Sequence, residues 1–193
     1  MSKLIVYNFV TLNGYFKGAN EDISWAKKGS KEESDFAADN LKSGNILLFG
    51  RVTYEMMEKY WPTPEAQKND PIVAEGMNEA EKIVFSNTLT TANWKNTRII
   101  KNDIVEEIKK LKKQNEKDLV LLGSGTIVNQ FAEQGLIDEY QIMVHPVVIG
   151  EGTPLMKNID HMMDLKLTVT KAFPSGVVLH CYKPSKPEPQ PAL

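Results

Sequence analysis

The chain has 193 residues, of which 41% are hydrophobic and 25% are charged, and its 23 Lys and Arg residues against 25 Asp and Glu residues leave a net charge of −2. This composition is typical of a globular protein with one core, and it excludes a disordered or fibrous chain. Nucleic acids and anionic membranes attract proteins through a basic excess, which this chain lacks. We therefore expect neither nucleic acid nor a membrane among its partners.

Cysteine and histidine are too sparse for a disulfide framework or a metal site. Cys181 is the only cysteine, and His145, His161 and His180 lack the close spacing that places two imidazoles on one helix face. The apolar run after Lys3 is too short to cross a membrane and is followed by no signal cleavage pattern. The sequence predicts a cytoplasmic protein without a bound metal.

Apolar runs alternate with amphipathic runs over the first two thirds of the chain. In chain order these predict a strand over Leu4–Phe9, a helix over Lys31–Lys42, a strand over Ile46–Phe49 and a helix over Arg51–Tyr60. Residues 61–80 contain three prolines and are predicted as a loop-like insert with room for one short helix. Next come a strand over Lys82–Phe85, a strand at Ile99 and Ile100, a helix over Ile104–Gln114 capped by Asp103 and Glu106, a strand over Leu119–Leu122 and a helix ending at Glu133.

Helical patterns stop after Asp138, and three strands are predicted over Tyr140–Ile149, Leu165–Ala172 and Val177–Tyr182. A turn at Pro174–Gly176 makes the last two strands an antiparallel hairpin. The sequence therefore predicts an α/β fold with a mixed, mostly parallel sheet, flanking helices and a C-terminal antiparallel hairpin. One domain is expected over residues 1–183, and the proline-rich residues 184–193 are predicted to be a disordered tail.

Two of the predicted strands pass through glycine directly into a helix. The residues at these two turns are Gly50, Arg51 and Thr53, and Gly123, Ser124, Gly125 and Thr126. A helix N-terminus offers free N–H groups and positive charge to a phosphate, and glycine lets the phosphate approach the backbone. Each turn alone could simply begin a helix, but two such turns favour a dinucleotide laid across the strand ends. The Rossmann fingerprint is not matched, because Val128 stands where its third glycine belongs.

Six short motifs occur in an order that resembles the dihydrofolate reductase-like superfamily. They are Thr11-Leu12-Asn13-Gly14-Tyr15, Phe49-Gly50-Arg51-Val52-Thr53-Tyr54-Glu55, Val84-Phe85-Ser86-Asn87, Leu122-Gly123-Ser124-Gly125-Thr126, Gly135-Leu136-Ile137-Asp138-Glu139 and Pro146-Val147-Val148-Ile149-Gly150-Glu151-Gly152. The resemblance runs from about Lys3 to Tyr182. It is strongest to the reductase domain of riboflavin biosynthesis, the C-terminal domain of the bifunctional deaminase-reductase.

The resemblance implies a reductase that uses NADPH and acts on a small heterocyclic substrate. In relatives the Gly-Arg-x-Thr and Gly-x-Gly turns hold the cofactor phosphates, and a serine after a strand lies near the adenosine 2′-phosphate. The cofactor residues implied for this chain are Gly50, Arg51, Thr53, Ser86, Gly123, Ser124, Gly125 and Thr126. Relatives often have a basic residue where Asn87 stands, so discrimination of NADPH from NADH would rest mostly on Arg51, with help from Lys95 or Arg98 if the fold brings them near.

The substrate end departs from the pattern of the relatives. Asn13 stands where relatives commonly have an aspartate, and an amide cannot supply a proton as a titrating carboxylate does. By analogy with dihydrofolate reductase, counting back from Gly50 reaches Ser34, with Asp35 beside it and Asp39 one turn on. Asp35 is the candidate catalytic carboxylate, with a solvated acid as the alternative. The residues expected to contact the substrate are Asn13, Tyr15, Trp25, Tyr54, Gly150, Glu151 and Gly152. Core packing is the alternative for Tyr54, and sheet packing is favoured for His145.

Three functions remain open from the sequence. The resemblance favours an NADPH-dependent reductase of a pyrimidine or pterin-like heterocycle, most like 5-amino-6-(5-phosphoribosylamino)uracil reductase. The alternatives are a non-catalytic protein that binds NADPH or a heterocycle, and a true dihydrofolate reductase. A homodimer is also predicted, since relatives commonly pair through the final strands, which here carry Val177, Val178, Leu179 and Tyr182.

Overall fold

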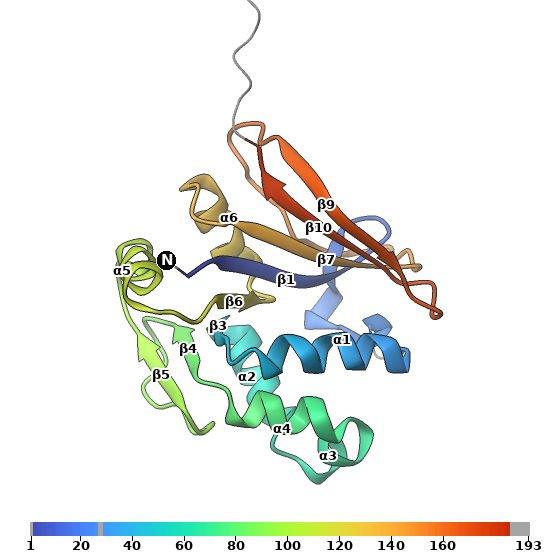
Figure 1. Cartoon of the computed structure of the whole chain (residues 1–193), viewed down its shortest axis with the longest axis horizontal. Coiled ribbons are helices and arrows are strands. Elements are labelled where there is room, and N and C mark those ends of the chain that lie inside the picture. Colours follow the sequence, from blue (N-terminus) through green and yellow to red (C-terminus); the bar gives the residue numbers. More distant parts are fainter. Residues whose placement is uncertain (1, 27–28, 186–193) are drawn as a thin grey trace, which may run out of the picture.

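The predicted strands form one continuous sheet in the computed structural model, which describes residues 2–26 and 29–185 (Figure 1). Its eight strands follow the order β5-β4-β3-β6-β1-β7-β10-β9. Their bounds are β1 Leu4–Thr11, β3 Ile46–Gly50, β4 Lys82–Phe85, β5 Thr97–Ile100, β6 Leu119–Leu122, β7 Glu139–His145, β9 Leu165–Ala172 and β10 Val178–Pro184. The strands from β5 to β7 in this order pair in parallel, whereas β10 and β9 pair antiparallel. The mostly parallel sheet with a C-terminal hairpin is therefore confirmed.

Helices cover both faces of the sheet (Figure 1). On one face lie α1 Lys31–Lys42, α2 Arg51–Tyr60, α3 Pro64–Asn69 and α4 Pro71–Glu79, and on the other lie α5 Ile104–Gln114 and α6 Gly125–Glu133. Strand β1 serves both layers, because Leu4 and Val6 pack toward α5 and α6 while Ile5 and Tyr7 pack toward α1 and α2. In the described part of the chain, no helix combines the length and the apolar character needed to span a membrane.

The insert at residues 61–80 folds into two helices, which corrects the prediction of a loop with one short helix. The prolines begin these helices instead of excluding them, since Pro64 and Pro71 stand at first-turn positions where the missing N–H has no intrahelical partner. The Thr63 and Asp70 side chains accept hydrogen bonds from Ala66 N (3.2 Å) and Val73 N (3.3 Å) as N-terminal caps. The insert thereby becomes a layer packed on α1.

Two predicted strand ends are shifted. Strand β7 stops at His145 instead of continuing to residue 149, because Pro146 has no N–H to offer a neighbouring strand. Strand β10 extends to Pro184, which pairs with Leu165 and lies one residue inside the predicted tail. Residues 186–193 of that tail lie outside the described residues.

Short segments around the strand ends were not predicted. Strand β2 (Tyr15–Gly18) pairs antiparallel with β8 (Gly152–Pro154), and two single turns follow β2, η1 (Ala19–Glu21) and η2 (Ser24–Ala26). At the start of α5 the predicted cap is wrong: Asp103 has a left-handed backbone with φ of 30°, and its side chain makes no capping hydrogen bond.

The register places five strand ends along one edge of the sheet. Gly50 at the end of β3 pairs with Phe85 at the end of β4, and Tyr7 of β1 pairs with Leu122 at the end of β6. Farther along β1, Thr11 pairs with His145 of β7. The loops after β1, β3, β4, β6 and β7 consequently meet at this edge, where ligands bind in open α/β sheets.

Candidate functional site

The glycine turns after β3 and β6 are locked to each other by hydrogen bonds. Gly50 N donates to Ser124 Oγ (2.7 Å), and Ser124 N donates to Thr53 Oγ1 (3.1 Å). Ser124 Oγ in turn donates to the Leu122 carbonyl (2.9 Å). The hydroxyls of Thr53 and Ser124 thus hold the protein together at this point. They set the N-termini of α2 and α6 side by side, with the free N–H groups of both helices at the same edge.

Only glycine fits at position 123. Its backbone has a φ of +57°, and a Cβ added there would lie 2.8 Å from both Thr53 Oγ1 and Thr53 Cγ2. The close approach is what allows Ser124 to reach the hydroxyl of Thr53. The Gly123-Ser124 pair therefore has a steric reason that is independent of any ligand.

A cavity of about 320 Å³ opens beside the locked turns. Its lining includes Gly50, Arg51, Thr53, Ser124, Gly125 and Thr126 from the turns and Phe16, Lys17, Glu21, Thr153 and Lys157 from facing segments. Within this described lining there are three cations, Arg51, Lys17 and Lys157, against the single carboxylate of Glu21. Two helix N-termini and three cations favour an anion with more than one negative charge.

Two of the three cations already have carboxylate partners. Arg51 Nη1 lies 2.9 Å from Glu55 Oε2, and Lys17 Nζ lies 2.5 Å from Glu21 Oε1. The Arg51–Glu55 pair is solvent-exposed on both sides and is worth little as an ion pair, so an anionic ligand can compete for Arg51, whereas Lys17 is half-buried in its pair with the exposed Glu21.

A second cavity of about 300 Å³ adjoins the first, because Phe85 and Ile127 line both. Its remaining lining is Ser86, Asn87, Asn102, Asp103, Ile104, Val105 and Gln130. The two adjoining cavities make a path from the glycine turns to the ends of β4 and β5. The chemistry of this path suits a dinucleotide, with the phosphates at the turns and a flat base against the apolar side chains of the second cavity.

Ser86 and Asn87 shape the turn between these cavities. Ser86 Oγ accepts hydrogen bonds from Leu89 N (2.9 Å) and Thr88 N (3.2 Å), and Asn87 Oδ1 accepts from Asn102 N (2.9 Å). The side chains of Ser86 and Asn87 therefore fix the backbone of this turn by hydrogen bonds, as the side chains of Thr53 and Ser124 fix the glycine turns.

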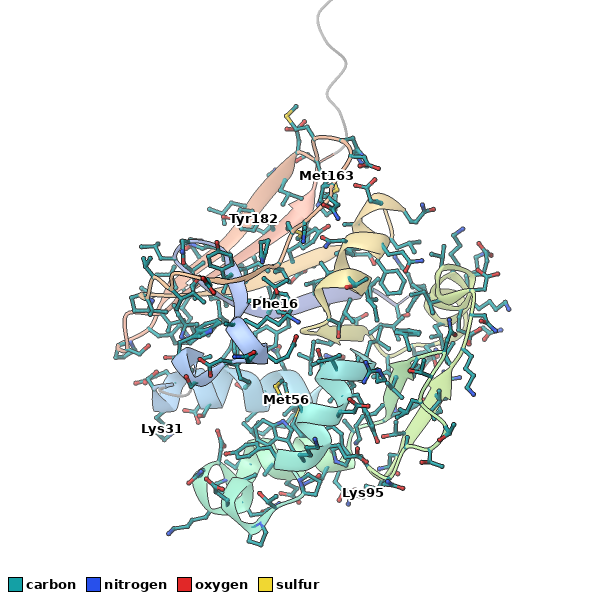
Figure 2. All side chains as sticks on the ribbon, turned by 180° about the vertical axis from the view of Figure 1, so that it is seen from behind. Phe16, Lys31, Met56, Lys95, Met163 and Tyr182 are labelled. Atoms are coloured by element: carbon teal, nitrogen blue, oxygen red, sulfur yellow. The ribbon has the colours of Figure 1, made fainter. Side chains whose placement is uncertain are left out.

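Neither alternative cation proposed from the sequence lines the cavities. Arg98 lies 4.0 Å from Glu81 and 3.9 Å from Glu107, and Lys95 pairs with Glu79 at the edge of the molecule (Figure 2). Among the residues expected to bind phosphate, Arg51 is thus the cation that the fold brings to the site.

The loops at the substrate end are joined through Asn13. Asn13 Nδ2 donates to the Ile149 carbonyl (2.8 Å), and Asn13 Oδ1 accepts from Thr11 Oγ1 (2.8 Å). Both ends of the amide are therefore occupied by the loops after β1 and β7. The next residues, Gly150, Glu151 and Gly152, lead into β8, whose pairing with β2 brings Gly152 against Tyr15. The structure thus brings together five of the residues predicted to contact the substrate, namely Asn13, Tyr15, Gly150, Glu151 and Gly152.

Trp25 lies against a histidine that the sequence did not favour for a functional role. The rings of Trp25 and His145 are 5.3 Å apart and nearly perpendicular, and the His145 ring is also 5.5 Å from that of Phe9. His145 is 5% exposed, and burial lowers the pKa of its imidazole, partly offset by the carboxylate of Glu33. The imidazole is therefore neutral at pH 7.

The model of the RibD C-terminal domain matches residues 2–179. The chain belongs to the RibD C-terminal domain family. Its relatives include the uncharacterized protein YyaP of Bacillus subtilis (strain 168), which is 33% identical over 182 residues, 93% of this chain and 94% of YyaP.

Solved structures share the fold of this RibD C-terminal domain. One is a protein assigned to riboflavin biosynthesis in Shewanella sp. PV-4, with a TM-score of 0.77, 18% identity and coverage of 95% of this chain and 99% of that one. Another is dihydrofolate reductase from Enterococcus faecalis, solved with NADP(H), with a TM-score of 0.65, 17% identity and coverage of 95% and 97%. The dihydrofolate reductase-like fold and the family expected from the six motifs are both confirmed.

Within this family fold, Asp35 does not reach the site. Its carboxylate is exposed and lies 2.7 Å from Nζ of Lys31, a residue on the outer side of the molecule (Figure 2). The acid of α1 that turns inward is Glu33, which is 8% exposed and accepts hydrogen bonds from Ser30 N (3.0 Å) and from the hydroxyl of Ser175. The spacing of Ser30 and Glu33 is a capping-box signal in the sequence, although it does not reveal the burial.

Tyr54 also lies away from the site. Its side chain is fully buried among Phe49 and Trp94, and its hydroxyl accepts from Trp94 N (3.1 Å) and donates to Glu58 (3.1 Å). The alternative of core packing therefore describes Tyr54, and the expectation that it walls the substrate pocket is corrected.

Proposed function

We propose that this RibD C-terminal domain is an NADPH-dependent reductase of a pyrimidine or pterin-like heterocycle, most like 5-amino-6-(5-phosphoribosylamino)uracil reductase. The observation that carries the proposal is the pair of locked glycine turns, whose cation-lined cavity continues into a second cavity over β4 and β5. A dinucleotide fits this path, with its diphosphate at the N-termini of α2 and α6. A buried thiol at Cys181 without a disulfide suits the reducing cytoplasm.

The chain's residues would hold and orient the cofactor. Arg51, Gly125 and Thr126 would bind phosphate, and the second cavity would take the adenosine between Ile104 and Val105. When bound, NADPH supplies the hydride. If the adenosine lies over β4 and β5, the nicotinamide half would extend toward β1, and the residues at the end of β1 would hold the substrate beside it.

The face of β1 next to this position suits a flat ring. Phe9 belongs to an interior strand and yet is 38% exposed, so the sheet is uncovered there. The rings of Tyr7 and His145 lie against Phe9, and the ring of Trp25 lies against His145. An uncovered aromatic surface on a central strand is what a planar heterocycle would need for stacking.

The proposal is tested by titrating the full chain with NADPH and then following NADPH oxidation in the presence of 5-amino-6-(5-phosphoribosylamino)uracil, dihydrofolate and related heterocycles. Turnover of the uracil compound or a close analogue is expected. Tight NADPH binding without turnover of any compound would favour the non-catalytic alternative, and selective turnover of dihydrofolate would favour a true dihydrofolate reductase. Absence of NADPH binding would refute the proposal.

Arg51→Ala is expected to weaken NADPH binding by about 1.5–3 kcal/mol, roughly ten- to a hundredfold, the range for a hydrogen bond to a charged group. Arg51 is the cation among the predicted phosphate ligands and lines the cavity, and its exposed partner Glu55 is a weak competitor. If the phosphate it binds is the 2′ one, NADH binding should fall much less. Fluorescence titration with both cofactors measures the two losses.

Arg98→Ala is the matched control, because Arg98 pairs with Glu81 and Glu107 outside both cavities. It should leave both affinities within about threefold. Equal losses of NADPH and NADH in Arg51→Ala would make Arg51 a general phosphate ligand and remove it from cofactor discrimination.

We further propose a homodimer formed through the edge strand β9. The residues predicted for this contact include Val177 and Leu179, which are buried at the inner strand β10 and cannot supply the surface. All of β9 is exposed, including the apolar side chains of Leu165, Leu167 and Val169, which is unusual for an unprotected edge. Val169→Glu should therefore shift the protein to a monomer in sedimentation experiments at micromolar concentration, whereas Lys166→Glu on the same strand should not. A wild-type monomer under these conditions would contradict the dimer.

A further inference from the structure

Two buried polar atoms in the described part of the chain lack a hydrogen-bond partner, and they belong to neighbouring rings. They are Trp25 Nε1 and His145 Nε2, on side chains whose ring centroids are 5.3 Å apart. All other buried side-chain nitrogen and oxygen atoms of the described residues are paired. An unpaired buried polar group is costly, and native proteins contain few of them. Two such groups at one point, beside the edge where the strand ends meet, indicate a place prepared for a ligand.

The chemistry of the two nitrogens restricts that ligand. An indole N–H can only donate, so Trp25 requires an acceptor. A neutral imidazole nitrogen either accepts or donates, depending on its tautomer, so His145 can pair with a ring N–H or with a carbonyl. The lactam edge of a heterocycle, an N–H next to a C=O, offers both complements side by side.

The surroundings favour an uncharged, planar ring at this point, so a charged substituent of the substrate, such as a phosphate, would lie away from it. Phe9 lies 5.5 Å from the His145 ring and presents an exposed aromatic ring on an interior strand. The nearby carboxylate of Glu33 is tied to Ser30 and Ser175 and would repel an anion.

We propose that Trp25 and His145 are the specificity-determining pair for the substrate, and that they recognise the lactam edge of an uncharged heterocycle stacked on Phe9. This inference rests on the proposed function, which places the nicotinamide beside β1. Trp25 lies on the short turn η2, and a rotation of its ring would present both nitrogens to the ligand. The pair thereby selects oxo-substituted pyrimidine or pteridine rings over fully alkylated ones.

The probe for this pair is lumazine, an uncharged pteridine with lactam edges, and 1,3-dimethyllumazine is its N-methylated counterpart. Calorimetric titration into the NADPH-loaded full chain should show lumazine binding clearly tighter than the dimethyl compound. His145→Leu and Trp25→Phe should each weaken lumazine binding by about tenfold, because each leaves a ligand group unpaired. Neither substitution should change the weaker binding of the dimethyl compound. His145→Gln keeps a polar end near the position of Nε2 and should restore part of the affinity.

His180→Leu is the control, since the His180 imidazole lies on β10 and contacts Thr170 of β9. Nitrogen NMR of histidine-labelled protein should show lumazine shifting the His145 ring signals and not those of His180. Wild-type protein that does not bind lumazine, or variants that lose both ligands equally, would overturn the pairing and leave Trp25 and His145 as packing residues. The NADPH titration in the same samples tests the proposed function separately, because the cofactor residues lie on other turns.

Discussion

Gly123→Ala is expected to reduce NADPH binding by about a hundredfold or more, close to 3 kcal/mol. The added Cβ would lie 2.8 Å from two atoms of Thr53, so the turn after β6 and helix α2 must move apart. This movement breaks the hydrogen bond from Ser124 N to Thr53 Oγ1 and separates the two helix N-termini that would hold the diphosphate. The left-handed backbone adds about 1–2 kcal/mol of strain. Titration with NADPH and a thermal unfolding curve measure the two effects.

Gly135→Ala is the control that separates the effect of the clash with Thr53 from the effect of the left-handed backbone. Gly135 has a φ of +60°, almost the same as Gly123, but a Cβ added there meets nothing within 4 Å. It should lose roughly 1 kcal/mol of stability and keep its NADPH affinity within about threefold. The double variant Gly123→Ala with Thr53→Ser removes one of the two clashing atoms and should recover part of the binding. Equal losses of affinity in both alanine variants would show that the locked turns do not hold the cofactor.

Lys82→Met is expected to lower the free energy of unfolding by about 2–4 kcal/mol. Lys82 is fully buried at the start of β4, and its ammonium donates to the carbonyls of Met77 (2.9 Å), Asn78 (3.0 Å) and Ala80 (2.6 Å). It also lies 4.6 Å from the centre of the Trp94 ring. A methionine fills the space but leaves the carbonyls at the end of α4 unpaired in an apolar layer. Urea unfolding of both proteins measures the difference.

Lys95→Met provides the control for the loss of a lysine charge. Lys95 is exposed and pairs with Glu79 at the molecular edge, so its replacement should change stability by no more than about 0.5 kcal/mol. A loss in Lys82→Met as small as this would mean that water replaces the ammonium at the carbonyls.

The stability difference between wild type and Lys82→Met should also depend on pH. Burial, and then the charge of Lys95, lower the pKa of Lys82 to about 8 from its usual 10.5. Between these two values the unfolded chain binds more protons than the folded one, so the contribution of Lys82 to stability rises with pH. The wild type should therefore gain stability relative to Lys82→Met from about pH 8 upward. A constant difference across this range would contradict the lowered pKa.

The sequence by itself determined the elements that depend on local patterns. Fully apolar runs such as Ile46–Phe49 can only be buried strands when glycine and a helix follow, and this repeated unit predicts a parallel sheet. The same logic located both glycine turns and Arg51, because strand ends of a parallel sheet share one edge. The antiparallel end followed from the turn at Pro174–Gly176.

The tertiary structure decided which side chains face the site. Asp35 and Glu33 stand two residues apart on α1, about 200° around the helix, so the packing of α1 on the sheet turns one inward and the other to solvent. Tyr54 follows Thr53 in the same motif, yet it packs in the core.

The partners of polar groups were also settled by contacts between distant parts of the chain. The Asn13 side chain is hydrogen-bonded to Ile149, 136 positions away in the sequence. Ser124 is hydrogen-bonded to Gly50 and Thr53, which are 74 and 71 positions away. Trp25 and His145 meet only because η2 folds over the end of β7. Local sequence patterns encode secondary structure and its termini. The free or occupied state of a side chain depends on long-range packing, which no local pattern records.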